Sequence, residues 1–542
     1  MYKKNKLSTQ YPVSLWLALF LIAFLLLRGL GNDSLGYPDA DRILMDGVFV
    51  HDFLRDMPLL HIYDYTIHYF AQYPALSIGY RPPFFPLIEA IFNGTLGVTM
   101  SSSRLALVAF VLLGAVAWYR LVCRIFDANT ALLSLLLYAT TPFVVQWGWY
   151  TMAELPVLSM SLMTAYYYYR YTETDQARYF YAMSILFVLT VWTKQTAVFI
   201  AIWFVLYALF NGQLIAYLKR KEVWLGLLLM LVLLTPLAMI TLWLGKKNIS
   251  QSIGGAGGKV VSAHYIWHVL SFYFKKLYFK QLTQPVFFFS MLGMGLSVFY
   301  RDKRVHYFFL GILSTYVFFT YLNARDARYT LFWLPAFCLF AALPFYYLKK
   351  YPWPRYILSA LLVLTLSYQL YRVTEKSAMY ATGYDVAAQY VLEHSLVPMV
   401  FFDGFNNGYF TYFMRTLDAQ HRYFVLRGDK LLSSSSVFSK SSQAVHAHNT
   451  EDFRKVLVQY GVDLVVAESR NEVGIAIHDD FRAYLKTSDF ELLTAIPVDS
   501  NRSQLKNQQL LIYRFLQRQP LSADYLELHL PIVGQVLKVP MR

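Results

Sequence analysis

Eleven apolar runs constrain the fold of this chain more than any other feature of its sequence. They lie at about 13–30, 104–126, 128–147, 150–171, 178–193, 195–211, 222–244, 283–300, 305–322, 328–347 and 354–372. An apolar helix of about 20 residues crosses the hydrocarbon core of a bilayer. Hydrophobic residues make up 57% of the chain and charged residues only 15%, against about 25% charged residues in soluble domains. The sequence therefore predicts an α-helical polytopic membrane protein with about 11 transmembrane helices.

The charges of the short loops predict the topology. Lys3, Lys4 and Lys6 precede the first run and place the N-terminus in the cytoplasm,. That run is long and lacks a small-residue cleavage site, so we expect an uncleaved first span. Every loop that then faces the cytoplasm carries at least two Lys or Arg. Counting Pro83–Val98 as a further span would reverse this pattern, so it is predicted to lie in the outer interface, and the chain after Arg372 lies outside.

Residues 373–542 differ in character from the transmembrane domain predicted at 1–372. Charges return there, and the apolar runs shorten to strand length at 397–403, 423–426, 462–468, 492–498 and 510–515, with helices expected at 385–393, 451–460 and 479–486,. This pattern predicts an extracytoplasmic soluble α/β domain that binds an acceptor, caps a site or mediates assembly. Two further outward regions, 31–103 and 245–282, belong to the transmembrane domain, and the second contains a glycine-rich run at 253–259.

Composition excludes some classes of function. The net charge of +15 suggests nucleic acid at first sight, but the basic residues lie in short loops between apolar runs, where they set topology. The chain has two cysteines, Cys123 and Cys338, both within or beside apolar runs, so no disulfide framework or thiolate metal site is predicted. The glycine-rich run at 253–259 lacks the preceding strand and the following Ser or Thr of a phosphate-binding loop.

Ionisable residues near the ends of transmembrane helices are costly and are therefore candidates for function. With the topology above, several of them gather at the outer surface: Asp39, Asp41, Arg42, Arg81, Glu154, Lys194, Arg325, Asp326 and Arg328. A single one, such as Lys194, is explained as well by anchoring at the interface. The set as a whole favours a polar site that faces outward.

Short motifs in the same places resemble a known family. The segments Tyr37–Arg42 and Tyr80–Pro86, Arg104-Leu105, Glu154 at the start of a span, and Arg325–Tyr329 before Leu334-Pro335 occur in order and on one side of the membrane. Together they resemble GT-C glycosyltransferases, in particular the protein O-mannosyltransferase and aminoarabinose transferase group (glycosyltransferase family 39-like). The likeness covers about residues 10–345. It implies a GT-C-like fold and the transfer of a sugar from a polyprenyl-monophosphate donor.

The resemblance also implies roles for individual residues. Asp39 takes the position of the family's aspartate after the first span, while Ala40 replaces the glutamate that usually follows, and Asp41 is a second candidate for the primary carboxylate. We expect Asp39 to act as general base, with Asp41 or Glu154 as a second acid or acceptor-positioning group, because a desolvated carboxylate near another one has a raised pKa. Arg81 matches the family's basic residue before Pro-Pro, but the acidic residue upstream is absent.

The leaving polyprenyl phosphate needs positive charge around it. Four residues are predicted to supply this charge: Arg81, Lys194, Arg325 and Arg328. A monophosphate carries less charge than a diphosphate, so no cofactor is required by this interpretation. A divalent metal is the alternative, and on one helix His61, Asp64 and His68 would share a face at a spacing that such an ion accepts,. The simpler interpretation of this segment is an amphipathic helix at the interface.

Other functions remain open at this stage. A lipid or sugar transporter or flippase usually has charges near the bilayer midplane and repeated halves, which this sequence lacks. An oligosaccharide ligase with a diphosphate donor, and a non-catalytic sensor or assembly protein, are further alternatives. The expected partners are a polyprenyl-phosphate-linked sugar, an acceptor on lipid, glycan or protein, and the bilayer. The compact loops and the type of tail favour a bacterial inner membrane, by analogy with the family.

Overall fold

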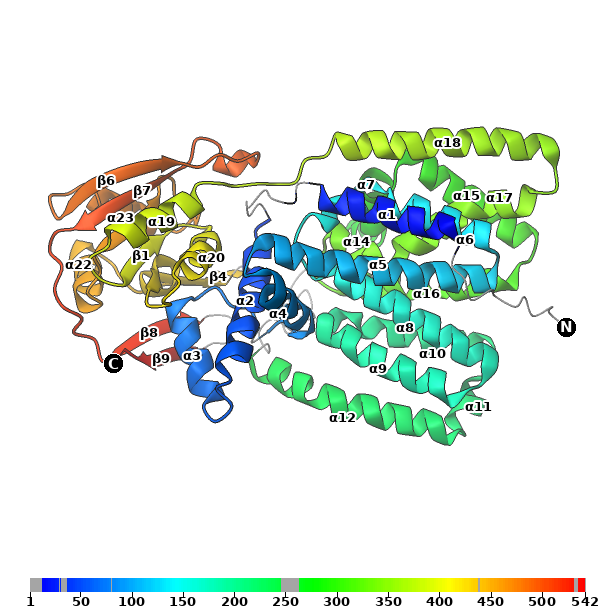
Figure 1. Ribbon diagram of the computed structural model, residues 1–542, viewed down its shortest axis with the longest axis horizontal. Helices are drawn as coiled ribbons and strands as arrows, with labels where there is room; N and C mark the ends of the chain where they lie inside the picture. Colours follow the sequence, from blue (N-terminus) through cyan, green and yellow to red (C-terminus); the bar gives the residue numbers. More distant parts are fainter. Residues whose placement is uncertain are drawn as a thin grey trace. The chain divides into compact units, whose positions relative to one another are not determined.

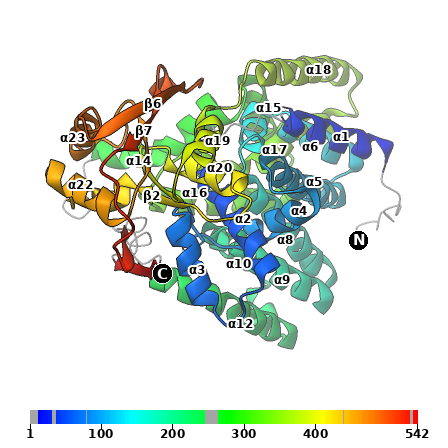
Figure 2. The same cartoon turned by 60° about the vertical axis from the view of Figure 1, so that its left-hand side comes forward.

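The computed structural model in Figures 1 and 2 describes residues 12–28, 30, 37–78, 80–244, 263–436, 439–530 and 535–541. The Lys-rich start and the glycine-rich run at 253–259 lie outside the described residues. The chain divides into two compact units. A helical unit comprises Met1–Leu30, Arg104–Ala238 and Ser252–Ser377, and a mixed unit comprises Gly31–Ser103, Met239–Gln251 and Ala378–Arg542.

The helical unit contains a helix at each of the eleven apolar runs predicted from the sequence. Its elements are α1 (Val13–Leu27), α5 (Met100–Ile125), α6 (Ala128–Ala139), α7 (Pro142–Gly148), α8 (Glu154–Thr174), α9 (Ala177–Thr193), η1 (Gln195–Val198), α10 (Phe199–Phe210), α11 (Leu214–Leu218), α12 (Lys221–Leu244), α14 (Ala263–Lys276), η2 (Leu277–Gln281), α15 (Gln284–Phe299), η3 (Lys303–Val305), α16 (His306–Tyr321), η4 (Ala327–Trp333), α17 (Leu334–Leu348) and α18 (Pro352–Thr374).

Four helices in the described part of the chain are long and apolar enough to cross a membrane by themselves: Met100–Ile125, Lys221–Leu244, Ala327–Leu348 and Tyr356–Thr374. Helices α6 and α7 form a fifth candidate that is bent by 64°. The bend falls at Pro142, the first residue of α7, because proline has no N–H to continue the hydrogen-bond ladder of the preceding helix. Five further apolar helices have 10–17 residues, so the number of spans stays a prediction.

Close approach of helices in this unit depends on small residues. A Cβ added at Gly293 of α15 would lie 1.8 Å from the carbonyl oxygen of Phe340 on α17. One turn earlier, the Ser290 hydroxyl donates a hydrogen bond of 2.8 Å to the carbonyl oxygen of Phe337. Small residues and hydroxyls stabilise helix pairs where lipid replaces water and the hydrophobic effect no longer drives association.

The mixed unit joins the first outward region to the tail. It contains α2 (Ala40–Asp56), α3 (Ile62–Gln72), α4 (Phe84–Leu96), α19 (Tyr384–His394), β1 (Met399–Asp403), α20 (Asn407–Leu417), β2 (Phe424–Arg427), α21 (Gly428–Leu431), β3 (Ser433–Ser436), β4 (Ser439–Val445), α22 (Thr450–Gln459), β5 (Leu464–Glu468), α23 (Ile477–Tyr484), β6 (Phe490–Pro497), η5 (Ser503–Leu505), β7 (Gln509–Phe515), β8 (Tyr525–Leu530) and β9 (Gln535–Pro540).

Five strands form one sheet in the order β2-β1-β5-β7-β6. Strand β1 is parallel to β2 and β5, whereas β7 is antiparallel to both β5 and β6. These are the five strands predicted for the tail, and the three predicted helices are present as α19, α22 and α23. The sequence interpretation missed α20 and the two hairpins, β3–β4 and β8–β9.

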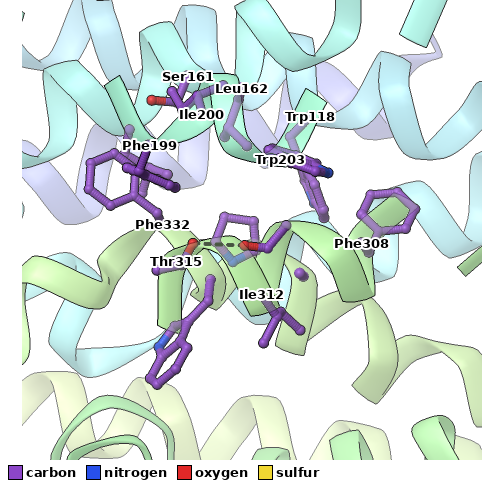
Figure 3. Close-up of a pocket in the computed structure, with 15 residues that line it drawn as sticks. Trp118, Ser161, Leu162, Phe199, Ile200, Trp203, Phe308, Ile312, Thr315 and Phe332 are labelled. Atoms are coloured by element: carbon purple, nitrogen blue, oxygen red, sulfur yellow. Dashed lines mark hydrogen bonds between the residues drawn. The ribbon is translucent and has the colours of Figure 1, made fainter. Parts of the chain in front are cut away.

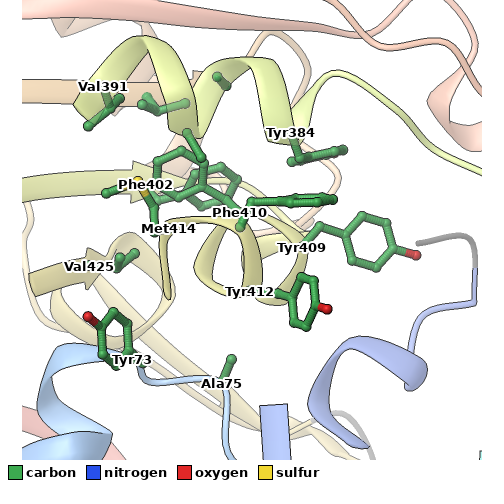
Figure 4. Packing of buried hydrophobic residues seen from close by; sticks show 14 of the residues in the cluster. Tyr73, Ala75, Tyr384, Val391, Phe402, Tyr409, Phe410, Tyr412, Met414 and Val425 are labelled. Atoms are coloured by element: carbon green, nitrogen blue, oxygen red, sulfur yellow. The ribbon is translucent and has the colours of Figure 1, made fainter. Parts of the chain in front are cut away.

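One hydrophobic cluster contains residues from both parts of the mixed unit. Figure 4 shows Tyr73 and Ala75, which follow α3, near the side chains of β1, β2, α19 and α20. The members from α2 include Leu44, Met45, Val48 and Phe49. Contacts therefore group the region 31–103 with the tail, although the sequence interpretation assigned it to the domain 1–372.

Candidate active site

Asp39 and Arg81 form an ion pair in the mixed unit. Asp39 precedes the first turn of α2, and its Oδ1 lies 3.3 Å from Nη2 of Arg81. Arg81 Nη1 also lies 3.4 Å from the backbone carbonyl oxygen of Asp39. The Asp39 side chain is 35% exposed and the Arg81 side chain 28%. Both predicted site residues are therefore accessible while they remain paired.

Asp46 fixes the turn that carries Arg81. Its Oδ1 accepts hydrogen bonds from the backbone N–H of Ser77 at 2.7 Å and of Ile78 at 3.0 Å. The Arg81 backbone N–H then donates to the carbonyl oxygen of Ser77 at 2.8 Å. Burial raises the pKa of Asp46 to about 6, although these donors oppose the shift. Sequence reasoning missed this residue, and its one signal was an acidic side chain among the apolar residues of α2.

Asp41 is the buried carboxylate of the group. Its side chain is 4% exposed, and its Oδ1 accepts a hydrogen bond of 2.8 Å from the backbone N–H of Arg42. Burial raises the pKa of Asp41 to about 6, the neighbouring Asp39 raises it further, and Arg42 and Arg81 oppose the shift. A carboxylate with such a pKa exchanges protons near neutral pH, which is the property a general base or its partner needs.

A second charged cluster lies in the helical unit. The Lys194 ammonium donates a hydrogen bond of 2.8 Å to Oε1 of Glu154, and Arg328 Nε lies 3.6 Å from the same oxygen. Glu154 opens α8, Lys194 separates α9 from η1, and Arg328 lies in η4. The structure thus brings together three predicted site residues from three helix boundaries.

Cations outnumber carboxylates in this second cluster. The rings of Tyr329 and Trp147 flank it, with the Arg328 guanidinium 5.4 Å and 5.7 Å from their centroids. Arg325 lies nearby in sequence, and its buried Nε has no hydrogen-bond partner among the described residues. Ammonium and guanidinium groups such as these bind phosphate through charge-assisted hydrogen bonds.

An apolar pocket adjoins this cluster along the same helices (Figure 3). Its wall includes Leu158, one turn after Glu154, and Phe332, one turn after Arg328. The remaining lining is mainly apolar and includes five aromatic residues: Trp118, Phe199, Trp203, Phe308 and Trp333. The hydrogen bond drawn in Figure 3 runs from the Thr315 hydroxyl to the carbonyl oxygen of Gly311, 2.8 Å away, so it satisfies the backbone of α16.

The predicted metal trio does not assemble. His61 Nδ1 lies 3.9 Å from Oδ2 of Asp64, and both side chains are well exposed. His68 instead packs against the ring of Phe424 at 5.5 Å. The physical reason is that α3 begins at Ile62, and His61, with φ −132°, stands outside the helical face on which the prediction relied. Among the described residues, no three His, Cys, Asp or Glu side chains gather in an arrangement that would hold a metal ion.

Sequence reasoning also missed a buried polar network in the tail. Ser433 Oγ lies 2.9 Å from Nε2 of His478, whose Nδ1 lies 2.5 Å from Oδ1 of Asp403. Arg482 Nη1 pairs with the other oxygen of Asp403 at 2.8 Å. A serine, a histidine and an aspartate linked in this order also form the catalytic triad of serine hydrolases. Ser433, His478 and Asp403 are all fully buried, however, so a substrate has no access to the serine hydroxyl. The network therefore joins β1, β3 and α23, and nothing in the spacing of these residues could have revealed it.

Comparison with known proteins identifies the fold. Residues 80–240 match the family described as dolichyl-phosphate-mannose-protein mannosyltransferase. No curated protein matches the chain in a search by sequence. Among solved structures, the chain is similar to ArnT from Cupriavidus metallidurans bound to undecaprenyl phosphate, with a TM-score of 0.60 and 12% identity over 92% of this chain and 97% of that one.

Two other solved structures have the same fold. The oligosaccharyltransferase AglB from Archaeoglobus fulgidus, in complex with an inhibitory peptide and a dolichol-phosphate, has a TM-score of 0.52 and 13% identity over 84% of this chain and 69% of that one. The arabinofuranosyltransferase AftD from Mycobacteria has a TM-score of 0.51 and 12% identity over 96% of this chain and 41% of that one. This chain therefore has the GT-C fold of membrane glycosyltransferases, as its sequence motifs predict.

Proposed function

We propose that this protein transfers a sugar from a polyprenyl-monophosphate donor to an acceptor hydroxyl on the outer face of a membrane. The observation that carries the proposal is the group of Asp39, Asp41 and Arg81, which places an accessible carboxylate beside a buried one of raised pKa. The structures of ArnT with undecaprenyl phosphate and of AglB with a dolichol-phosphate support a donor of this class. The site faces outward if the N-terminus is cytoplasmic, as the loop charges predict.

Asp39 acts as general base in this scheme, because it is the accessible member of the pair. It removes the proton of the acceptor hydroxyl as the oxygen attacks the anomeric carbon. The bond from that carbon to the phosphate oxygen breaks, and the bonding electrons leave with the polyprenyl phosphate. A single displacement of this kind inverts the anomeric centre. When Asp41 is ionised, its charge makes Asp39 a stronger base.

The cations receive the charge of the leaving group. Arg81, which lies beside Asp39 in the mixed unit, has this role at the carboxylate pair. Lys194, Arg325 and Arg328 are the phosphate-binding residues that the sequence predicts for the helical unit. Arginine binds phosphate through two parallel hydrogen bonds, and such charge-assisted bonds strengthen as charge develops on the phosphate oxygens. Glu154 holds Lys194 and Arg328 in place through their shared contact. A monophosphate needs no metal in this scheme.

Release of lipid phosphate tests the proposal. The purified protein in lipid nanodiscs is incubated with a panel of polyprenyl-phosphate sugars and acceptors, and free polyprenyl phosphate is measured. We expect Asp39→Asn to lower the rate about 10²- to 10⁴-fold, the usual contribution of a general base. Asp64→Asn is the matched control, because this exposed aspartate lies in the same unit, and it should retain the parental rate.

Each outcome has a distinct meaning. Equal rates for Asp39→Asn and the parent would contradict the role of Asp39. Turnover with polyprenyl-diphosphate donors alone would favour an oligosaccharide ligase. If no donor releases its lipid phosphate, while labelled lipid crosses the bilayer of reconstituted vesicles, the protein is a flippase and the proposal fails.

A further inference from the structure

Helix α20 of the tail lies directly on Asp41. Gly408 is the second residue of this helix. A Cβ added at Gly408 would lie 1.8 Å from Oδ2 of Asp41 and 2.5 Å from its Cγ. A side chain at this position would require the Asp41 carboxylate to move, because the first turn of α20 lies directly against it. This contact accounts for part of the burial of Asp41, which is 4% exposed.

A buried ion pair fastens the same two helices further along. Arg415 Nε donates a hydrogen bond of 2.9 Å to Oδ2 of Asp52, and Arg415 Nη2 also contacts that oxygen. The Tyr69 hydroxyl from α3 donates to Oδ2 of Asp52 at 2.6 Å and accepts from Arg415 Nε at 3.1 Å. The side chains of Asp52 and Arg415 are 0% and 5% exposed. Water therefore has little access to this ion pair.

The two contacts have matching positions along the helices. Asp41 and Asp52 are about three turns apart on α2, and Gly408 and Arg415 are about two turns apart on α20, so each pair shares one face of its helix. Met45 of α2 and Met414 of α20 are both fully buried members of the same hydrophobic cluster. Figure 4 shows Met414 and its neighbours on α20 within this cluster. The ion pair and the cluster hold the first turn of α20 in place.

We propose that α20 is a positioning element for the carboxylate pair of the active site, with Gly408 as the cover of Asp41 and the Asp52–Arg415 pair as its anchor. The inference rests on the proposed function and gives the tail a role in catalysis. Charged and titratable groups that face Asp41 are Asp39, Arg42, Arg81 and Tyr409. Tyr409 follows Gly408 in α20, and its hydroxyl accepts a hydrogen bond of 3.3 Å from Arg502 Nη1.

The cover has two consequences for the reaction. It keeps water from Asp41, so the carboxylate takes up a proton at a higher pH than an exposed aspartate would. It also fixes the position of Asp41 relative to Asp39. A displacement of about 1 Å at a reacting group lowers a rate by up to about 10²-fold. A side chain at position 408 would cause a displacement of this size.

The variant Gly408→Ala tests the inference, with Gly94→Ala as the matched control. Gly94 also lies in a helix of the mixed unit, but its added Cβ would be 3.8 Å from Cδ2 of His51, an ordinary contact. The protonation of Asp41 is followed by the infrared band of its carboxyl group, identified by its loss in Asp41→Asn. The rate of polyprenyl phosphate release is measured between pH 5 and 8 at several donor concentrations.

We expect the Asp41 titration midpoint to lie near pH 6 in the parent and in Gly94→Ala. In Gly408→Ala it should fall by about one pH unit, because water reaches the displaced carboxylate. The value of kcat should fall about 10²-fold, while KM for the donor stays within about twofold. An unchanged midpoint and kcat in a folded Gly408→Ala protein would overturn the inference.

A second variant covers the case in which Gly408→Ala does not fold. Arg415→Lys keeps the charge of the anchor but loses the two-nitrogen contact with Asp52. It should shift the Asp41 midpoint in the same direction by a smaller amount, and an unchanged midpoint would again contradict the role of α20. The infrared titration needs no turnover. If Asp39→Asn retains full activity, the proposed function fails, yet the titration still decides whether α20 controls Asp41.

Discussion

Replacement of Arg415 by methionine should destabilise the mixed unit strongly. The change leaves the packing volume of the side chain nearly intact but removes the cation from the fully buried Asp52. Loss of one partner of a buried ion pair costs about 3–5 kcal/mol, because the other charge stays buried without compensation. Asp52 retains the hydrogen bond from Tyr69 and contacts with His51 at 3.2 Å and Arg55 at 3.6 Å. We therefore expect the lower end of this range, about 3 kcal/mol.

The measurement is thermal unfolding of the purified protein at pH 7.5, followed by near-ultraviolet circular dichroism. A loss of about 3 kcal/mol lowers Tm by about 6–12 °C for a unit of this size. The double variant Asp52→Asn, Arg415→Met removes both charges and should recover at least half of that loss. The reasoning is refuted if Arg415→Met melts within about 2 °C of the parent, or if the double variant is less stable than the single one.

Two further predictions concern the other buried carboxylates. Glu154→Gln should raise KM for the donor about tenfold, because the neutral amide holds Lys194 and Arg328 less firmly. A charge-assisted hydrogen bond contributes about 1.5 kcal/mol, which corresponds to this factor. An unchanged KM in steady-state kinetics would contradict the prediction. Glu89 is 0% exposed, and its carboxyl group lies close to the Ser103 side chain and the Asp46 carboxylate. Burial holds the pKa of Glu89 well above its usual range, so the folded protein keeps the proton while the unfolded chain ionises above about pH 4.5. The stability of the parent should therefore fall as pH rises above that value. Glu89→Gln should remove the share of this loss that comes from Glu89, so the loss between pH 5 and 8 should be smaller in unfolding experiments on the variant. A variant that is less stable than the parent at pH 8 would count against this.

The secondary structure was largely predictable because its signals are local. Each of the eleven apolar runs is helical, and all five strands of the main sheet were predicted. Helix α20 was missed because it begins Asn407-Gly408, residues typical of a turn,. Only its packing on α2 and the strands stabilises it as a helix. The hairpin β3–β4 was missed because its serine-rich sequence lacks the alternation expected of a strand,.

The sequence by itself determined the class of protein, since hydropathy and loop charge act on each segment independently through its partition between lipid and water. It also supplied the candidate residues, because charges near helix ends are conspicuous in an apolar chain. Only the tertiary structure decided which of them meet. Asp39 pairs with Arg81, Glu154 with Lys194 and Arg328, and Asp41 lies under Gly408 of the tail. Contacts between residues so distant in sequence depend on the packing of whole helices, and no local pattern records them.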